Sequence, residues 1–165
     1  MPAVPSSLPS LQRKNAEKLF DQLGIVDLFE ISQLSPRSFN WVKNYFADNE
    51  FQEEVCLYVN MSSTISLSVI FEDEQIDWWF YGRRDAKRYE LEDMVQRTEA
   101  ISGMGLVFGE AEPGVYACST ICIPSILKFV ECLSSLFNTS VRLLKVDSAQ
   151  YDNLKVLQSI EILRK

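Results

Sequence analysis

Few side chains of this 165-residue chain have the types and spacing that catalysis or metal binding requires. The sequence has no histidine, so a serine or cysteine nucleophile has no imidazole base to activate it. Cys118 and Cys122 would share one face of a strand, which suggests a pair of thiolate ligands. No C-x-x-C pair exists, however, and cysteines in a reducing compartment usually pack as small apolar residues. We therefore expect no catalytic residue, no metal site and no cofactor.

Carboxylate chemistry stays open in principle, because paired acids can catalyse reactions without histidine. The acidic residues here occur in runs typical of surfaces, such as residues 53–54 and 72–74. Such runs lie outside the apolar segments that would perturb the pKa of a carboxyl group. The glycines over residues 103–109 are not followed by Gly-Lys-Ser or Gly-Lys-Thr, so they form no phosphate-binding loop. These features predict a protein that is not an enzyme.

The segment over residues 74–82 is too apolar for an ordinary strand with one face in water. Side chains alternate along a strand, so Trp78 points to one face while Trp79 and Tyr81 point to the other. One face can fill the core, but the other still needs cover from a helix, a second copy or another protein. Because Trp and Tyr are favoured anchors of interfaces, Trp78, Trp79 and Tyr81 are candidate partner-binding residues.

A basic cluster follows this segment and begins with Arg83 and Arg84. It lies at the start of a helix predicted over residues 85–101, where the helix dipole favours anions rather than cations. The cluster could bind a phosphate or an acidic segment of a partner, or pair with the acids that follow it in an exposed turn. We include Arg83, Arg84 and Met94, from the apolar face of the helix, among the candidate partner-binding residues.

The elements that must position these residues follow from hydrophobic periodicity and from turn residues. Helices are expected over residues 11–23, 36–49, 85–101, 125–137 and 149–163. Strands are expected over residues 54–60, 63–71, 74–82, 106–108, 115–123 and 141–146. Gly24 is expected to end the first helix, and residues 25–36 fit either a short helix or a strand.

This order predicts an α+β fold with an antiparallel sheet of five to six strands. A three-strand meander, a helix, a hairpin and a helix follow one another, helices pack on the sheet, and an extra helical region precedes it. Residues 1–9, which contain three prolines, read as a flexible tail. Residues 10–165 read as a single α+β domain, in which residues 10–50 could form a helical appendage.

Charge and composition restrict the partners. The formal net charge of −7 argues against binding to nucleic acid or to an anionic membrane surface. No apolar run of about 18 residues spans a membrane, and the N-terminus lacks the features of a signal peptide. We therefore expect a cytoplasmic location. Acidity is compatible with a basic protein partner, and equally with an ordinary soluble protein.

From residue 53 to residue 137 the order of elements resembles that of the small effector chaperones of type III secretion. Residues 65–81 look like the second and third strands of that family, and residues 105–137 are similar to its last hairpin and final helix. The resemblance implies a homodimer that wraps an extended, unfolded effector segment around apolar grooves. It makes the outward aromatics and the helix over residues 85–101 candidates for the dimer or the groove. The helical region before residue 50 and the elements after residue 140 depart from the family pattern.

Three hypotheses follow. The first is a non-catalytic, chaperone-like protein of the cytoplasm that holds a partner protein through apolar and aromatic surface. The second is an acidic immunity protein or enzyme inhibitor that blocks a basic active site. The third is a metal or thiol protein built on Cys118 and Cys122, which predicts bound zinc or a reactive thiolate.

Overall fold

The computed structural model describes residues 13–51, 53–62, 64–81, 96–98, 107–118 and 123–146. In chain order its helices are α1 (Arg13–Phe20), α2 (Ile25–Ser32), α3 (Pro36–Asp48) and α5 (Ile123–Leu136). Its strands are β1 (Cys56–Met61), β2 (Ile65–Phe71), β3 (Glu74–Phe80), β4 (Gln96–Thr98), β5 (Val107–Glu112), β6 (Val115–Cys118) and β7 (Val141–Val146). The tail predicted over residues 1–9 and the helix predicted over residues 149–163 lie outside the described residues.

One of the N-terminal helices has a local cause, and another is selected by packing. α3 begins at Pro36, and the side chain of Ser35 caps it by accepting a hydrogen bond from Ser38 N–H at 3.1 Å. The segment that fitted either a helix or a strand is the helix α2. Its residues Ile25, Leu28 and Phe29 are buried at the three- and four-residue spacing of one helical face, so packing against the core selects the helix.

Gly24 begins α2 rather than ending α1, so the expectation that it ends the first helix was wrong. Its backbone is extended (φ −77°, ψ 171°), whereas a glycine that ends a helix commonly adopts a positive φ. Gly24 has no side chain to cap α2, and Glu74 of β3 reaches this end of the helix instead. One carboxylate oxygen of Glu74 lies 3.4 Å from the backbone nitrogen of Val26.

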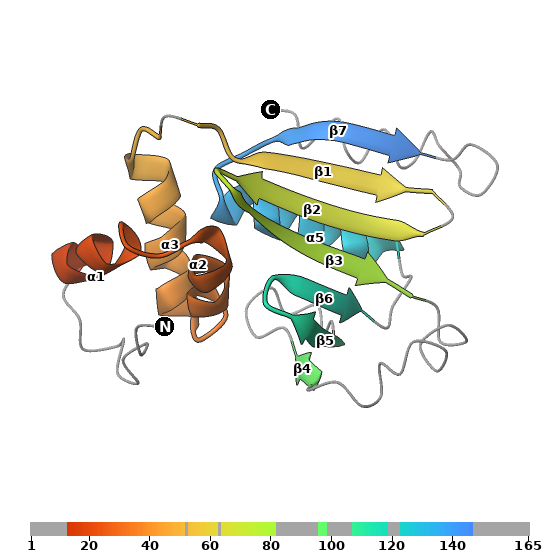
Figure 1. Cartoon of the computed structure of the whole chain (residues 1–165), viewed down its shortest axis with the longest axis horizontal. Helices are drawn as coiled ribbons and strands as arrows, with labels where there is room; N and C mark the ends of the chain where they lie inside the picture. The colour runs from red at the N-terminus through yellow and green to blue at the C-terminus, as the bar shows by residue number, and fades with distance from the viewer. Residues whose placement is uncertain are drawn as a thin grey trace.

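The described strands form one seven-stranded sheet in the order β4-β5-β6-β3-β2-β1-β7 (Figure 1). The predicted meander β1-β2-β3 and the predicted hairpin β5-β6 are both antiparallel. However, β6 lies parallel to β3, and β7 lies parallel to β1. The α+β class is confirmed, whereas the expectation of an antiparallel sheet was wrong because the sheet is mixed. After β6 the chain passes through α5 and returns beside β1, and crossovers of this kind make strands parallel.

The prediction of a helix over residues 85–101 was wrong for residues 96–98, which are the only part of that segment that the structure describes. Gln96–Thr98 is the strand β4, which pairs antiparallel with β5 from Gln96 opposite Gly109 to Thr98 opposite Val107. Apolar residues at helical spacing predicted the helix, but the exposed edge of β5 offers backbone groups that a strand can pair with. Tertiary pairing of this kind commonly overrides local periodicity.

α2 and α5 cover one face of the sheet, here called the inner face. At its centre the Trp78 ring lies 5.0 Å from Phe29 of α2, 5.5 Å from Phe129 of α5 and 5.9 Å from Tyr116 of β6. In Figure 1, α5 runs behind β1, β2 and β3, and the N-terminal helices lie beside one end of the strands. The buried strand residues of the inner face are Leu57, Val59, Met61, Ile65, Leu67, Val69, Phe71, Ile76, Trp78, Phe80, Tyr116, Cys118 and Val141.

Candidate functional site

The two adjacent tryptophans of β3 have different environments. Trp78 is fully buried (0% exposed) in the core between α2 and α5, so it presents no surface to a partner. Its indole N–H has no hydrogen-bond partner among the described residues, so apolar packing in the core holds the ring. Trp79 is partly exposed on the opposite face, here called the outer face. No described helix packs on the outer face (Figure 1).

Small side chains flank Trp79 on the outer face. In the sheet register Trp79 lies opposite Ser66 of β2 on one side and Ala117 of β6 on the other, and each of these two residues is 8% exposed. At the β7 edge Leu143 lies opposite Tyr58 and is 57% exposed. The outer face therefore combines a central indole with apolar surface at its edge, a combination that suits contact with another protein.

The one carboxylate beside Trp79 on β3 is already hydrogen-bonded within the sheet. Asp77 accepts a hydrogen bond from the hydroxyl of Ser68, and both of its oxygens lie 2.8 Å from the side-chain nitrogen of Gln75. These bonds satisfy the carboxylate locally. Asp77 thus belongs to the sheet, and the character of the outer face comes from its aromatic and aliphatic side chains.

The remaining predicted partner-binding residues follow β3. Tyr81 is partly buried, and its backbone N–H donates to the carbonyl oxygen of Cys118 at 2.8 Å, which extends the pairing between β3 and β6 by one residue. Arg83, Arg84 and Met94 lie outside the described residues. The structure therefore places Trp79 and Tyr81 near one another in the sheet and separates both from the buried Trp78.

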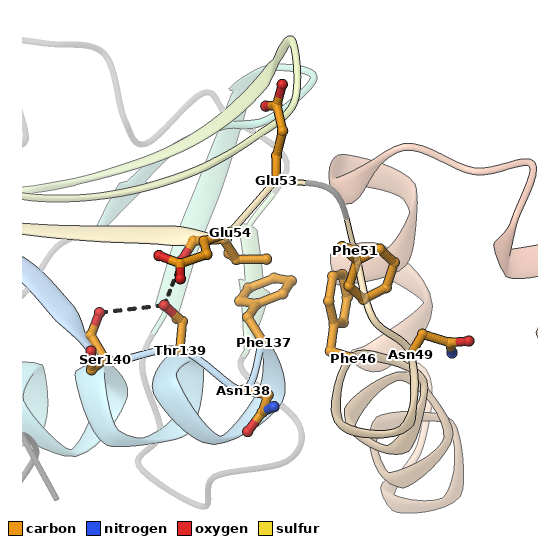
Figure 2. A pocket seen from close by; sticks show the side chains of 10 residues that line it. Phe46, Asn49, Phe51, Glu53, Glu54, Phe137, Asn138, Thr139 and Ser140 are labelled. Carbon is orange, nitrogen blue, oxygen red and sulfur yellow. Dashed lines mark hydrogen bonds between the residues drawn. The ribbon is translucent and has the colours of Figure 1, made fainter.

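A cavity of about 300 Å³ opens where α3, β1 and the end of α5 meet. Figure 2 shows Phe137 on one side of it, with Phe46 and Phe51 on the other. The Phe46 ring lies 5.4 Å from Phe51 and 5.2 Å from Phe137, so three rings form an aromatic floor. Phe46 and Phe137 are almost fully buried, whereas Phe51 keeps part of its surface exposed.

Phe51 also lines a second cavity of about 300 Å³. Its aromatic lining includes Tyr45 and Phe71, whose rings lie 5.5 and 5.2 Å from Phe51. Phe51 and Asn49 line both cavities, so the two adjoin at these residues. We call this pair of hollows the Phe51 cavities.

Carboxylates surround both of the Phe51 cavities. The acidic residues in the two linings are Glu53 and Glu54 in the first cavity and Asp21, Glu50 and Glu72 in the second. All five are exposed, and none of the described lining residues is basic. In Figure 2 the Glu53 side chain points away from the three rings, while Glu54 lies above Thr139. Aromatic floors with acidic rims favour cationic groups, through charge attraction and cation–π contact.

Hydrogen bonds fix the rim of the first cavity. The hydroxyl of Thr139 donates to the carbonyl oxygen of Val55 at 2.5 Å, which ties the end of α5 to the start of β1. Glu54 also forms an ion pair with Arg142 of β7, with 3.0 Å between Arg142 Nη1 and Glu54 Oε2. The side chains of Arg142 and Glu54 are 59% and 85% exposed, so solvent screens this ion pair. Another cationic group can therefore readily replace Arg142 beside Glu54.

Tyr45 is the titratable residue of the second cavity with a clear pKa shift. Its hydroxyl donates to Asp21 Oδ1 at 3.1 Å. Burial, the hydrogen bond to Asp21 and the negative charges of Asp21 and Glu72 together raise the pKa of Tyr45 to about 12. At neutral pH the hydroxyl therefore stays protonated, and it holds the Asp21 carboxylate at the edge of the cavity.

The Phe51 cavities were absent from the sequence-based list of candidate residues. Their linings come from α1, α2, α3, the start of β1, the end of β2 and the end of α5, which no local pattern joins. One signal did exist, because Phe51 interrupts an acidic run that extends from Glu50 to Glu54. A large ring among charges in a connecting segment is a reason to look for exposed aromatic surface.

The cysteines bear on the metal or thiol hypothesis. Cys118 is buried, and this burial strongly raises the pKa of its thiol, so the reactive thiolate is suppressed at neutral pH. Neither Cys56 nor Cys118 forms a disulfide, and Cys122 lies outside the described residues. Within the described parts of the chain, no group of three or more cysteine or acidic side chains is arranged to hold a metal ion.

No known protein family, curated protein or solved structure matches this chain. Among the helices that the structure describes, none is both long enough and apolar enough to cross a membrane.

Proposed function

We propose that this chain is a non-catalytic, chaperone-like protein that holds a partner protein. The observation that carries the proposal is the outer face, where Trp79 is partly exposed between two small, nearly buried neighbours. A tryptophan in such surroundings can enter a pocket of another protein without first breaking contacts of its own core. A cytoplasmic location and a homodimer are parts of the same proposal.

The partition of β3 between its two faces supports this role. Trp78 stabilises the fold because all its ring contacts lie in the core, whereas Trp79 has no described helix over it. The absence of histidine from the sequence also supports a role without triad-type catalysis. The outer face is therefore a surface for contact with protein, either a second copy of this chain or a different one.

A photo-cross-linking residue at position 79 tests the proposal in cells that express the chain. We expect cross-linked products heavier than the 18.9 kDa chain, either a chain dimer or a conjugate with another protein. The matched control carries the same residue at position 131, where Glu131 is exposed on α5, and should give far less product. Cross-linking that is equally poor at both positions would contradict the proposal.

The acidic inhibitor remains a second candidate function, and the carboxylates around the Phe51 cavities favour it. An inhibitor of this kind would present them to a basic active site. Its partner would be a folded enzyme, whereas a chaperone-like protein holds an extended chain. The identity of the protein cross-linked at position 79 distinguishes these two functions.

A further inference from the structure

We propose that the Phe51 cavities bind a basic segment of a partner protein, with its arginine or lysine side chains entering from the acidic rim over the partly exposed ring of Phe51. The proposal rests on the proposed function to the extent that the occupant is protein. The Phe51 cavities are a surface separate from the outer face. Their lining indicates the charge of the bound segment, which the outer face does not indicate.

The shape of the site suits long basic side chains. Each cavity has a volume of about 300 Å³ and an aromatic floor, and the partly exposed Phe51 lines both. Arginine and lysine have apolar stems that pack on rings and charged ends that stay near water. A guanidinium group over a phenylalanine ring also gains cation–π attraction. An aromatic floor beneath an exposed carboxylate rim matches both parts of such a side chain.

Charge selects this occupant over an apolar one. The described linings contain five carboxylates and no basic residue, so an apolar segment would leave these charges without compensation. An acidic segment would be repelled. Glu50 and Glu72 are exposed and make no ion pair with another described residue.

Arg142 shows that the rim already accepts a guanidinium group. Its Nη1 lies 3.0 Å from Glu54 Oε2, and both side chains are mostly exposed. A basic segment therefore competes with Arg142 for Glu54. The two substitutions should therefore change binding in opposite directions. Their changes in net charge alone would give the same two signs, so a charge-matched substitution elsewhere on the surface is needed to locate the binding.

The test uses a fluorescein-labelled peptide, Gly-Ser-Arg-Gly-Arg-Ser-Gly, and fluorescence anisotropy with the full chain at low salt. We expect saturable binding with a Kd below about 1 mM. The same peptide with citrulline in place of arginine keeps the shape but loses the charge, and it should bind at least about tenfold more weakly. High salt should weaken binding of the arginine peptide because the rim is exposed.

Three single substitutions at exposed sites locate the binding. Glu54→Gln should weaken binding about two- to fivefold, and Arg142→Ser should strengthen it by a similar factor because it releases Glu54. Glu131→Gln, which changes the net charge equally at an exposed residue of α5 that lines neither cavity, should leave the Kd unchanged. Each substituted side chain is exposed, so all three variants should fold.

Three results would overturn the proposal: no binding of the arginine peptide, equal binding of the citrulline peptide, or equal effects of Glu54→Gln and Glu131→Gln. These results leave the proposed function intact, because cross-linking at position 79 reports on the outer face alone. Conversely, peptide binding that follows the predicted pattern would stand even if cross-linking at position 79 failed.

Discussion

Tyr45 couples the second of the Phe51 cavities to pH. Its pKa is raised from 10.0 to about 12 in the folded protein, so the unfolded chain loses this proton at lower pH than the folded chain does. The folded state therefore binds more protons between about pH 10 and 12, and the free energy of unfolding falls as pH rises through that range. Below about pH 10 the contribution of Tyr45 is fully present.

The variant Tyr45→Phe should isolate this effect. It removes the ionisable hydroxyl and its hydrogen bond to Asp21, but it keeps the ring contacts with Phe20 and Phe46. We expect wild type to be more stable than Tyr45→Phe at about pH 8, with a difference that shrinks by about pH 11. Urea unfolding at both pH values measures it. A difference that is constant with pH would show that Tyr45 titrates normally.

Gly24 and Glu74 form a contact that joins the start of α2 to β3. A Cβ atom on Gly24 would lie 2.1 Å from Glu74 Oε1, so Gly24→Ala must displace the carboxylate that approaches Val26 N–H. A carboxylate near a helix N-terminus contributes about 0.3–1 kcal/mol, and we expect Glu74→Gln to destabilise the protein by that amount. Gly24→Ala should destabilise it by about 1 kcal/mol, because alanine is also a poor N-cap residue.

The two substitutions should not be additive. Once Gly24→Ala has displaced the Glu74 side chain, Glu74→Gln has little left to remove. Urea unfolding of both single variants and the double variant measures the coupling. Full additivity would mean that the Glu74 carboxylate does not stabilise α2.

At the scale of elements, local patterns predict whatever depends on neighbouring residues. Alternation over residues 65–71 predicts β2, and Ser35 followed by Pro36 predicts the start of α3. No local sequence pattern predicts the parallel pairing of β7 with β1, because this pairing depends on where the chain lies after α5. The same holds for β4, whose strand conformation depends on pairing with the edge of β5. Such long-range choices are decided by the assembled sheet.

The candidate sites also contain some features that local patterns predict and others that arise only when distant segments meet. The two-residue period of β3 predicts that Trp79 and Trp78 lie on opposite faces, although it does not say which face the helices cover. The Phe51 cavities need six separate segments to meet, and no period in any one of them predicts that meeting. Only the position of Phe51 within an acidic run was visible in the sequence.

The adjacent tryptophans give a direct test of the assignment of the two faces. Trp78→Ala removes a fully buried ring with contacts to Phe29 and Phe129, and it should destabilise the protein by about 3–5 kcal/mol. Trp79→Ala removes a partly exposed ring and should cost about 1 kcal/mol. Because the two variants carry the same substitution at adjacent residues, each serves as the matched control for the other. Similar losses in urea unfolding would show that both faces of β3 are equally covered.

Considering the whole molecule, the helices described on the sheet lie on its inner face, and the two candidate surfaces are separate. The outer face carries Trp79 and the exposed Leu143, while the Phe51 cavities lie where α3, β1 and α5 meet. A homodimer formed through the outer face would therefore leave the Phe51 cavities open to a different protein. This arrangement allows one chain to self-associate and to bind a basic segment at the same time.

Light scattering over a dilution series tests that arrangement. We expect the wild-type chain to show twice the mass of 18.9 kDa, and Trp79→Lys to show the mass of one chain, because a charge at position 79 cannot be buried between two copies. Leu34→Lys makes the same change in charge at a residue that is 61% exposed beyond α2, and it should leave the dimer intact. A wild-type chain that stays monomeric at every concentration would exclude the dimer. Trp79 would then be free for a different protein, and the single-site inhibitor would become the better account of the acidic rim.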